Sequence, residues 1–133
     1  MARASVLFEE FLDARGGRLP LRQGPAQIFL HGHCHQKAMG LLAPARSLLA
    51  TVPGATVVAI DAGCCGMAGS FGYSRDHFEV SRAIGERRLF PEIRKAPPGS
   101  VVVASGTSCR HQVHDFTGIR AVHPAVLLQS LIQ

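Results

Sequence analysis

Short apolar runs alternate with segments of helical periodicity from residue 27 onward, and this alternation limits the fold more than any other feature. Four runs have the composition of buried strands: residues 27–31, 55–61, 100–105 and 119–122. Four helical segments follow these runs in turn: residues 36–52, 74–94, 108–118 and 124–132. Pro44 must kink or split the first of these segments. Strands that alternate with helices form parallel sheets covered on both faces. The sequence therefore predicts an α/β, Rossmann-like domain with about four parallel strands and helices on both faces.

A further helix is predicted before the alternation begins. Apolar residues between Leu7 and Leu12 recur at helical spacing, and a pair of glycines ends the pattern. We expect this helix over residues 3–14. The chain is thus divided into an N-terminal helix and loop over residues 1–24 and the α/β domain over residues 25–133.

The bulk composition argues against several classes of protein. At 133 residues, with 47% hydrophobic and 17% charged residues, the chain resembles one globular domain. Its apolar runs are shorter than the roughly 20 residues that a membrane-spanning helix needs, and acidic residues in the apolar N-terminal stretch argue against a signal peptide. We therefore expect a cytoplasmic chain. The net charge of +5 comes from scattered basic residues without interleaved aromatic residues, which argues against a nucleic-acid partner.

All four cysteines follow predicted strands. Cys34 follows the first strand, Cys64 and Cys65 follow the second, and Cys109 follows the third. Sites in open α/β sheets are built from loops at the carboxyl ends of the strands, which meet at one edge. The four thiols are therefore predicted to converge on one centre, and His123, after the fourth run, is expected beside them.

Several uses of these cysteines are open. The adjacent Cys64 and Cys65 could form a strained vicinal disulfide, but disulfides are rare in a reducing cytoplasm. Inert buried thiols are common in cores, whereas these cysteines lie in polar loops rich in glycine. A Cys–His hydrolase would need only one activated cysteine. Structural zinc usually binds C-x₂₋₄-C pairs, which are missing from this sequence. A multi-iron cluster suits adjacent cysteines better, because each thiolate can bind a separate iron.

The residues around the cysteines carry further signals. Four glycines flank the cysteine pair and would let the backbone turn sharply beside a bulky ligand: Gly63, Gly66, Gly69 and Gly72. In the motif HGHCHQK, an extended backbone would point His31, His33 and His35 to one side and Cys34 to the other. This alternation favours hydrogen bonding to a centre, adventitious metal binding or a polar loop over direct ligation. Neither a Walker A nor a G-x-G-x-x-G pattern occurs, so nucleotide binding has no support.

The motif CCGMAGSFGY, preceded by HGHCHQKAMG and followed by GTSCRHQV and TGIRAVHPAVLL, resembles the cysteine-rich CCG domain. That domain occurs in the B subunit of heterodisulfide reductase and in the iron–sulfur subunits of glycolate oxidase, anaerobic glycerol-3-phosphate dehydrogenase and lactate-utilisation enzymes. The likeness covers about residues 27–133. It is greatest to the C-terminal CCG repeat of FAD-linked oxidases that are fused to iron–sulfur domains.

The resemblance implies that Cys34, Cys64, Cys65 and Cys109 hold an iron–sulfur cluster of the [4Fe–4S] type. It implies electron transfer from a reduced flavin toward a quinone or another acceptor, in an enzyme that oxidises 2-hydroxy acids such as lactate or glycolate. The FAD would belong to a partner, and this domain alone would catalyse nothing. Residues expected around the cluster are Gly63, Gly66, Ser108, His123 and His33.

The expected partners are flavin and ferredoxin-like domains or subunits, a second CCG repeat and, through the parent complex, a quinone at the membrane surface. One position departs from the family pattern C…CC…CxxC: Gly106 stands where the first cysteine of CxxC would be. Five cysteines in this family can hold a noncubane cluster, so four leave a conventional cluster, a partial cluster or another metal as alternatives. The rival interpretations are a mononuclear zinc site and a metal-free module that docks onto the flavin part.

Overall fold

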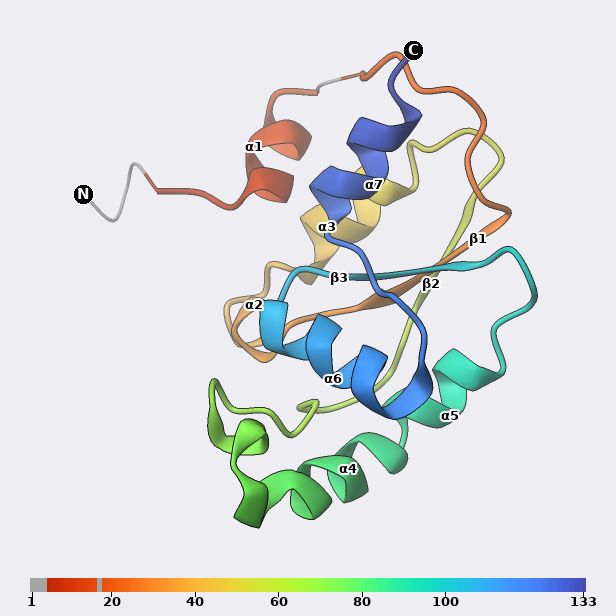
Figure 1. Cartoon of the computed structure of the whole chain (residues 1–133). Helices are drawn as coiled ribbons and strands as arrows, with labels where there is room; N and C mark the ends of the chain where they lie inside the picture. The colour runs from red at the N-terminus through yellow and green to blue at the C-terminus, as the bar shows by residue number, and fades with distance from the viewer. Residues whose placement is uncertain (1–4, 17) are drawn as a thin grey trace.

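The computed structural model describes residues 5–16 and 18–133, and its centre is a small parallel sheet (Figure 1). The sheet has three strands: β1 (Gln27–His31), β2 (Thr56–Ala59) and β3 (Val101–Ala104). The strand order is β2-β1-β3, so β1 lies in the middle and hydrogen-bonds to both neighbours. The three strands correspond to the first three apolar runs of the sequence. The predicted α/β fold class is confirmed.

The expected fourth strand does not form as a strand among the described residues. Val122 instead makes an isolated parallel bridge beside Val103, with the Val122 N–H donating to Val102 and the Val122 carbonyl accepting from Ala104, both at 2.9 Å. Only five residues separate Gly118, at the end of one helix, from Pro124 at the start of the next. The bridge involves a single residue pair, so the prediction of about four strands is corrected to three.

Helices surround the sheet. Within the described residues they are α1 (Phe8–Ala14), α2 (Cys34–Ala38), α3 (Leu42–Leu49), α4 (Phe78–Glu86), α5 (Leu89–Arg94), α6 (Thr107–Thr117) and α7 (Pro124–Leu131), with two short 3₁₀ helices, η2 (Phe71–Tyr73) and η3 (Arg75–His77). The predicted helix over residues 36–52 is split into α2 and α3. Gly40, at φ +71°, makes the break, and Pro44 lies in the first turn of α3, where its missing N–H costs no helical hydrogen bond. No helix in residues 5–16 and 18–133 has the length and apolar character to span a membrane.

Two hydrophobic cores lie on opposite faces of the sheet. Side chains alternate across a strand, so Ile28 and Leu30 of β1 face one way and Phe29 faces the other. The first core packs Ile28 and Leu30 against α3 and α7. The second packs Phe29 against Phe90 of α5 and Val113 of α6. Figure 1 shows α3 and α7 on one side of the strands and α5 and α6 on the other, which confirms that helices cover both faces.

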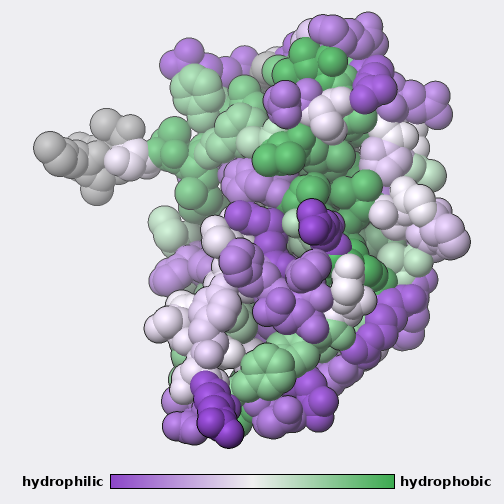
Figure 2. All heavy atoms as spheres, viewed as in Figure 1, coloured by the Kyte–Doolittle hydropathy of each residue, from purple (hydrophilic) through white to green (hydrophobic). Residues whose placement is uncertain are grey.

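The predicted N-terminal helix is present, and a polar side chain is buried on it. Residues 3 and 4 of the predicted helix lie outside the described residues, and α1 begins at Phe8. Its buried side chain is Glu9, 2% exposed, whose Oε1 accepts a hydrogen bond from Ser105 Oγ at 2.8 Å. Phe8 and Phe11 are exposed instead. Figure 2 shows hydrophobic side chains gathered on this face around α1 and α7, whereas the region over α6 is mostly polar.

Candidate metal centre

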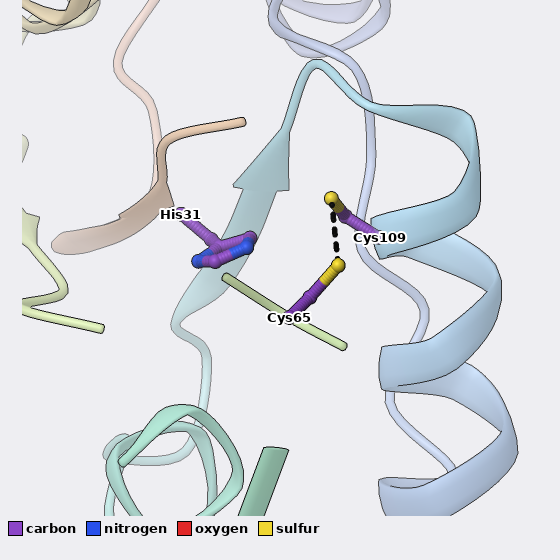
Figure 3. A group of neighbouring side chains, drawn as sticks. All are labelled: His31, Cys65 and Cys109. Atoms are coloured by element: carbon purple, nitrogen blue, oxygen red, sulfur yellow. Dashed lines mark hydrogen bonds between the residues drawn. The ribbon is translucent and has the colours of Figure 1, made fainter. Parts of the chain in front are cut away.

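Three side chains from three different strand ends meet inside the molecule. His31 is the last residue of β1, Cys65 lies in the loop after β2, and Cys109 lies in the first turn of α6, directly after β3. One ligand atom from each lies within 4.8 Å of those of the other two, and all three residues are buried. Figure 3 shows the imidazole and the two sulfurs pointing toward one another. The predicted convergence at the carboxyl edge of the sheet is therefore found for Cys65 and Cys109.

The two buried thiols interact directly. Cys65 Sγ and Cys109 Sγ lie 3.4 Å apart, which is a hydrogen-bond distance for sulfur and not a covalent bond. The hydrogen bond from the Cys109 thiol lowers the pKa of Cys65, helped by a hydrogen bond from His31. The same hydrogen bond, followed by burial, raises the pKa of Cys109. Two sulfurs this close together, beside a buried imidazole, form a ready donor set for a metal.

The other two cysteines lie on the outside of this pair. Cys34 begins α2 and is exposed, as is Cys64. Coulombic interaction with both also contributes to the raised pKa of Cys109. All four are free, which excludes a vicinal disulfide between Cys64 and Cys65 in this structure. The compact buried group nevertheless contains only two of the four predicted cysteines.

The loop that carries the cysteine pair depends on glycine at one position in particular. Gly66 has a φ of +97°, and its N–H donates to Cys64 Sγ at 3.3 Å. A Cβ at this position would lie 2.9 Å from Ile84 Cβ and 3.1 Å from the carbonyl oxygen of Ser81, both on α4. Gly66 therefore allows both the turn and the close approach of the helix. Gly63, by contrast, is exposed and has open space around it.

The remaining predicted neighbours make contacts of their own. Ser108 is half-buried in the first turn of α6. His33 caps α2, with its Nδ1 accepting from the N–H of His35 at 3.3 Å, and His123 caps α7, with its Nδ1 accepting from Ala125 at 3.1 Å. Burial lowers the pKa of His123. His33 and His123 also line one side of a cavity of about 320 Å³ beside α1.

The expectation for the HGHCHQK motif was wrong in one respect and incomplete in another. It assumed an extended backbone, but Cys34 starts a helix, so ligand atoms of His33, Cys34 and His35 come within 4.8 Å of one another. His31 was not proposed as part of the centre. The signal was in the strand alternation, because His31 lies on the same face of β1 as Phe29, and that face packs against Cys65.

A buried amide beside the thiols was not predicted from the sequence. Gln112 of α6 is fully buried, and its Nε2 donates to the carbonyl of Cys65, to the carbonyl of Ser81 at 3.1 Å and to Ser81 Oγ at 3.0 Å. This amide joins the cysteine loop to α4 and α6. Lys37 of α2 makes a second link, since its Nζ donates to the carbonyl of Ala62. A single glutamine in a helical pattern carries no signal for such contacts.

Sequence comparison relates the chain to parts of dehydrogenases. The chain is 34% identical over 113 residues to the C subunit of anaerobic glycerol-3-phosphate dehydrogenase from Escherichia coli (strain K12), a match that covers 85% of this chain and 28% of that protein. It is 31% identical over 106 residues to the D-2-hydroxyglutarate dehydrogenase of Escherichia coli (strain K12), covering 79% of this chain and 10% of that protein. It is 38% identical over 79 residues to the D-2-hydroxyglutarate dehydrogenase of Pantoea ananatis (strain AJ13355). That match covers 59% of this chain and 8% of that protein.

The chain therefore spans less than a third of the length of each of these curated relatives. No family model matches the chain, and no solved structure matches it significantly. The relatives support the oxidoreductase part of the interpretation: this chain is related to segments of dehydrogenases.

Proposed function

We propose that the chain is a CCG-type domain that holds an iron–sulfur cluster and transfers electrons within a dehydrogenase. The observation that carries the proposal is the 3.4 Å approach of Cys65 Sγ to Cys109 Sγ, from two different strand-end loops, beside the buried His31. Thiols and imidazoles are the donors that iron–sulfur clusters and zinc prefer, whereas hard cations prefer oxygen. The donor set therefore fits a cluster. The dehydrogenase relatives support an electron-transfer role.

In this proposal the four thiolates are the cluster ligands: Cys34, Cys64, Cys65 and Cys109. When bound, a [4Fe–4S] cluster would supply reversible one-electron chemistry. The buried pair would fix the cluster against the sheet edge, and the exposed pair would bind from the solvent side. The Gly66 N–H already donates to a sulfur, and N–H donors of this kind stabilise the reduced form of a cluster. Gly63, Ser108, His33 and His123 would surround the bound group.

The rest of the dehydrogenase would supply the flavin and the substrate. We propose flavin and ferredoxin-like domains or subunits and a second CCG repeat as partners, in a cytoplasmic enzyme that acts on a 2-hydroxy acid and passes electrons toward a quinone or another acceptor. Neighbouring hydrophobic residues of the α1 region, Leu7, Phe8 and Phe11, are exposed, and this surface is the proposed contact with those partners. The domain itself would move electrons and leave the substrate chemistry to the flavin.

A mononuclear zinc site is the second candidate. It is favoured by the compact group of His31, Cys65 and Cys109, whose ligand atoms lie within 4.8 Å of one another. Two thiolates and an imidazole are common ligands of tetrahedral zinc. The fourth ligand would have to come from an exposed cysteine, neither of which belongs to this compact group.

Metal analysis separates the two candidates. The chain is purified and reconstituted without oxygen, and iron, acid-labile sulfide and zinc are measured per chain. The proposal predicts near-equal iron and sulfide at several atoms per chain, with most of both lost in the Cys65→Ser, Cys109→Ser double variant. Ser47→Ala is the control, since Ser47 is exposed on α3. About one zinc and no sulfide would support the second candidate, and a metal-free chain would contradict both.

A further inference from the structure

We propose that His31 is itself a ligand of the metal centre and supplies the donor that the chain lacks at Gly106. The inference rests on the proposed function, because it assigns a ligand to the proposed centre. A mixed set of four thiolates and one imidazole would follow. Three features of the described residues support it: the space around Gly106, the position of the His31 ring, and the use of the other nearby histidines.

A side chain at position 106 would collide with two neighbouring side chains. A Cβ built on Gly106 would overlap the His33 ring and lie 2.9 Å from Cys109 Sγ. Real Cβ contacts are almost never this short, so a cysteine here would require the His33 ring and the Cys109 side chain to shift. The chain therefore cannot present a fifth thiolate from this position without rearrangement. In a centre with five ligands, the fifth donor would therefore come from another element.

His31 is placed to be that donor. Its ring is 1% exposed, and a ring nitrogen lies within 4.8 Å of both Cys65 Sγ and Cys109 Sγ (Figure 3). His31 Nδ1 is buried and has no hydrogen-bond partner among the described residues. Leaving a buried polar atom unpaired is unfavourable. A metal bond at Nδ1 would supply the missing partner.

Unlike His31, the neighbouring His33 and His123 have a hydrogen-bond partner at Nδ1. Nδ1 of His33 accepts from the N–H of His35, and Nδ1 of His123 accepts from the N–H of Ala125. Both rings are thereby fixed as helix caps. Neither belongs to the compact group that contains both buried sulfurs. The geometry thus selects His31 over the other two.

An imidazole ligand has a measurable consequence. Replacing thiolate by neutral imidazole removes negative charge from the centre, and histidine-ligated clusters have higher reduction potentials than all-cysteine ones. His31→Cys should therefore keep a cluster but lower its potential. His31→Leu, which retains buried volume without a donor, should lower cluster occupancy. His114→Ala is the matched control, because His114 is an exposed histidine on α6 away from the buried group.

The test is pulsed EPR of the paramagnetic cluster in chains labelled with ¹⁵N-histidine, combined with iron analysis and redox titration. The proposal predicts a directly coordinated histidine nitrogen in the wild-type and His114→Ala chains and its loss in His31→Cys. A full cluster without such a nitrogen, or with one that persists in His31→Cys, would overturn the inference and leave the proposed function standing. A wild-type chain that binds no metal under the same conditions would contradict both.

Discussion

At the scale of single residues, Gln112 holds the cysteine loop in place through its side-chain amide. Its buried Nε2 donates hydrogen bonds to the carbonyl of Cys65 and to both oxygens of Ser81. Replacing Gln112 by Ala would leave these acceptors unpaired and create a cavity in the core beside the thiols. We expect the free energy of unfolding of the metal-free chain to fall by about 1–3 kcal/mol, measured by urea denaturation. Gln129→Ala, at an exposed glutamine of α7, should change it by less than about 0.5 kcal/mol. Equal stability of the two variants would refute the structural role of the amide.

Two glycines near the centre should respond differently to the same substitution. Gly106→Ala forces a methyl group against the His33 ring and Cys109 Sγ, and such overpacking costs about 1–3 kcal/mol. Gly63→Ala enters open space, so we expect little loss of stability. Thermal unfolding of the two metal-free variants beside the wild type tests the contrast. An unchanged melting temperature for Gly106→Ala would mean that position 106 can accept a side chain after all.

Some neighbours in the metal centre could be predicted from the sequence and others could not. Cys65 and Cys109 were predictable neighbours, because parallel strands place the loops after them at one edge. His31 was within reach of the strand alternation, but linking it to the thiols requires knowing that α6 packs on the face of Phe29. The contacts of Gln112 depend on the relative positions of α4, α6 and a loop, and no local pattern encodes those positions.

At the scale of elements, the apolar runs predicted three strands correctly, but the helix predicted over 74–94 is divided into η3, α4 and α5. The fourth run was overestimated because β-branched residues also suit a connector that makes a single bridge. Helix breaks were the less predictable feature. The 36–52 segment breaks at Gly40, which adopts a left-handed conformation, whereas the sequence pointed to Pro44. Glycine is tolerated inside many helices, so its presence alone does not place a break.

One polar contact links α1 to the segment after β3. Glu9 is the buried residue of α1, and its Oε1 accepts a hydrogen bond from Ser105 Oγ, whereas Phe8 and Phe11 are exposed. Ser105→Ala removes this donor and leaves the carboxylate without it. We expect a loss of about 1–3 kcal/mol in the free energy of unfolding, measured by urea denaturation. Ser47→Ala is the matched control. A loss no larger than that of the control would show that the Glu9–Ser105 contact does not hold α1.

At the scale of the whole molecule, the sheet separates a core without cysteines from a core that contains two of them. One face packs α3 and α7 into a core that contains no cysteine, and the other packs α5 and α6 into the core that contains Cys65 and Cys109. A metal bound by loops from three strand ends would connect β1, β2 and α6. Because a metal that binds only the folded chain stabilises it, chelation should lower the melting temperature. Calorimetry of reconstituted and metal-stripped chains measures this, and no difference between them would argue against a centre that joins these loops.

The central claim is that the strand-end thiols hold one metal centre, and an iron anomalous-difference map tests it most directly. Crystals of the reconstituted chain would be grown without oxygen and measured on both sides of the iron absorption edge. The account predicts a strong iron peak at the carboxyl edge of the sheet, in contact with Cys65 Sγ and Cys109 Sγ. No iron peak there, with the two sulfurs still 3.4 Å apart, would contradict it.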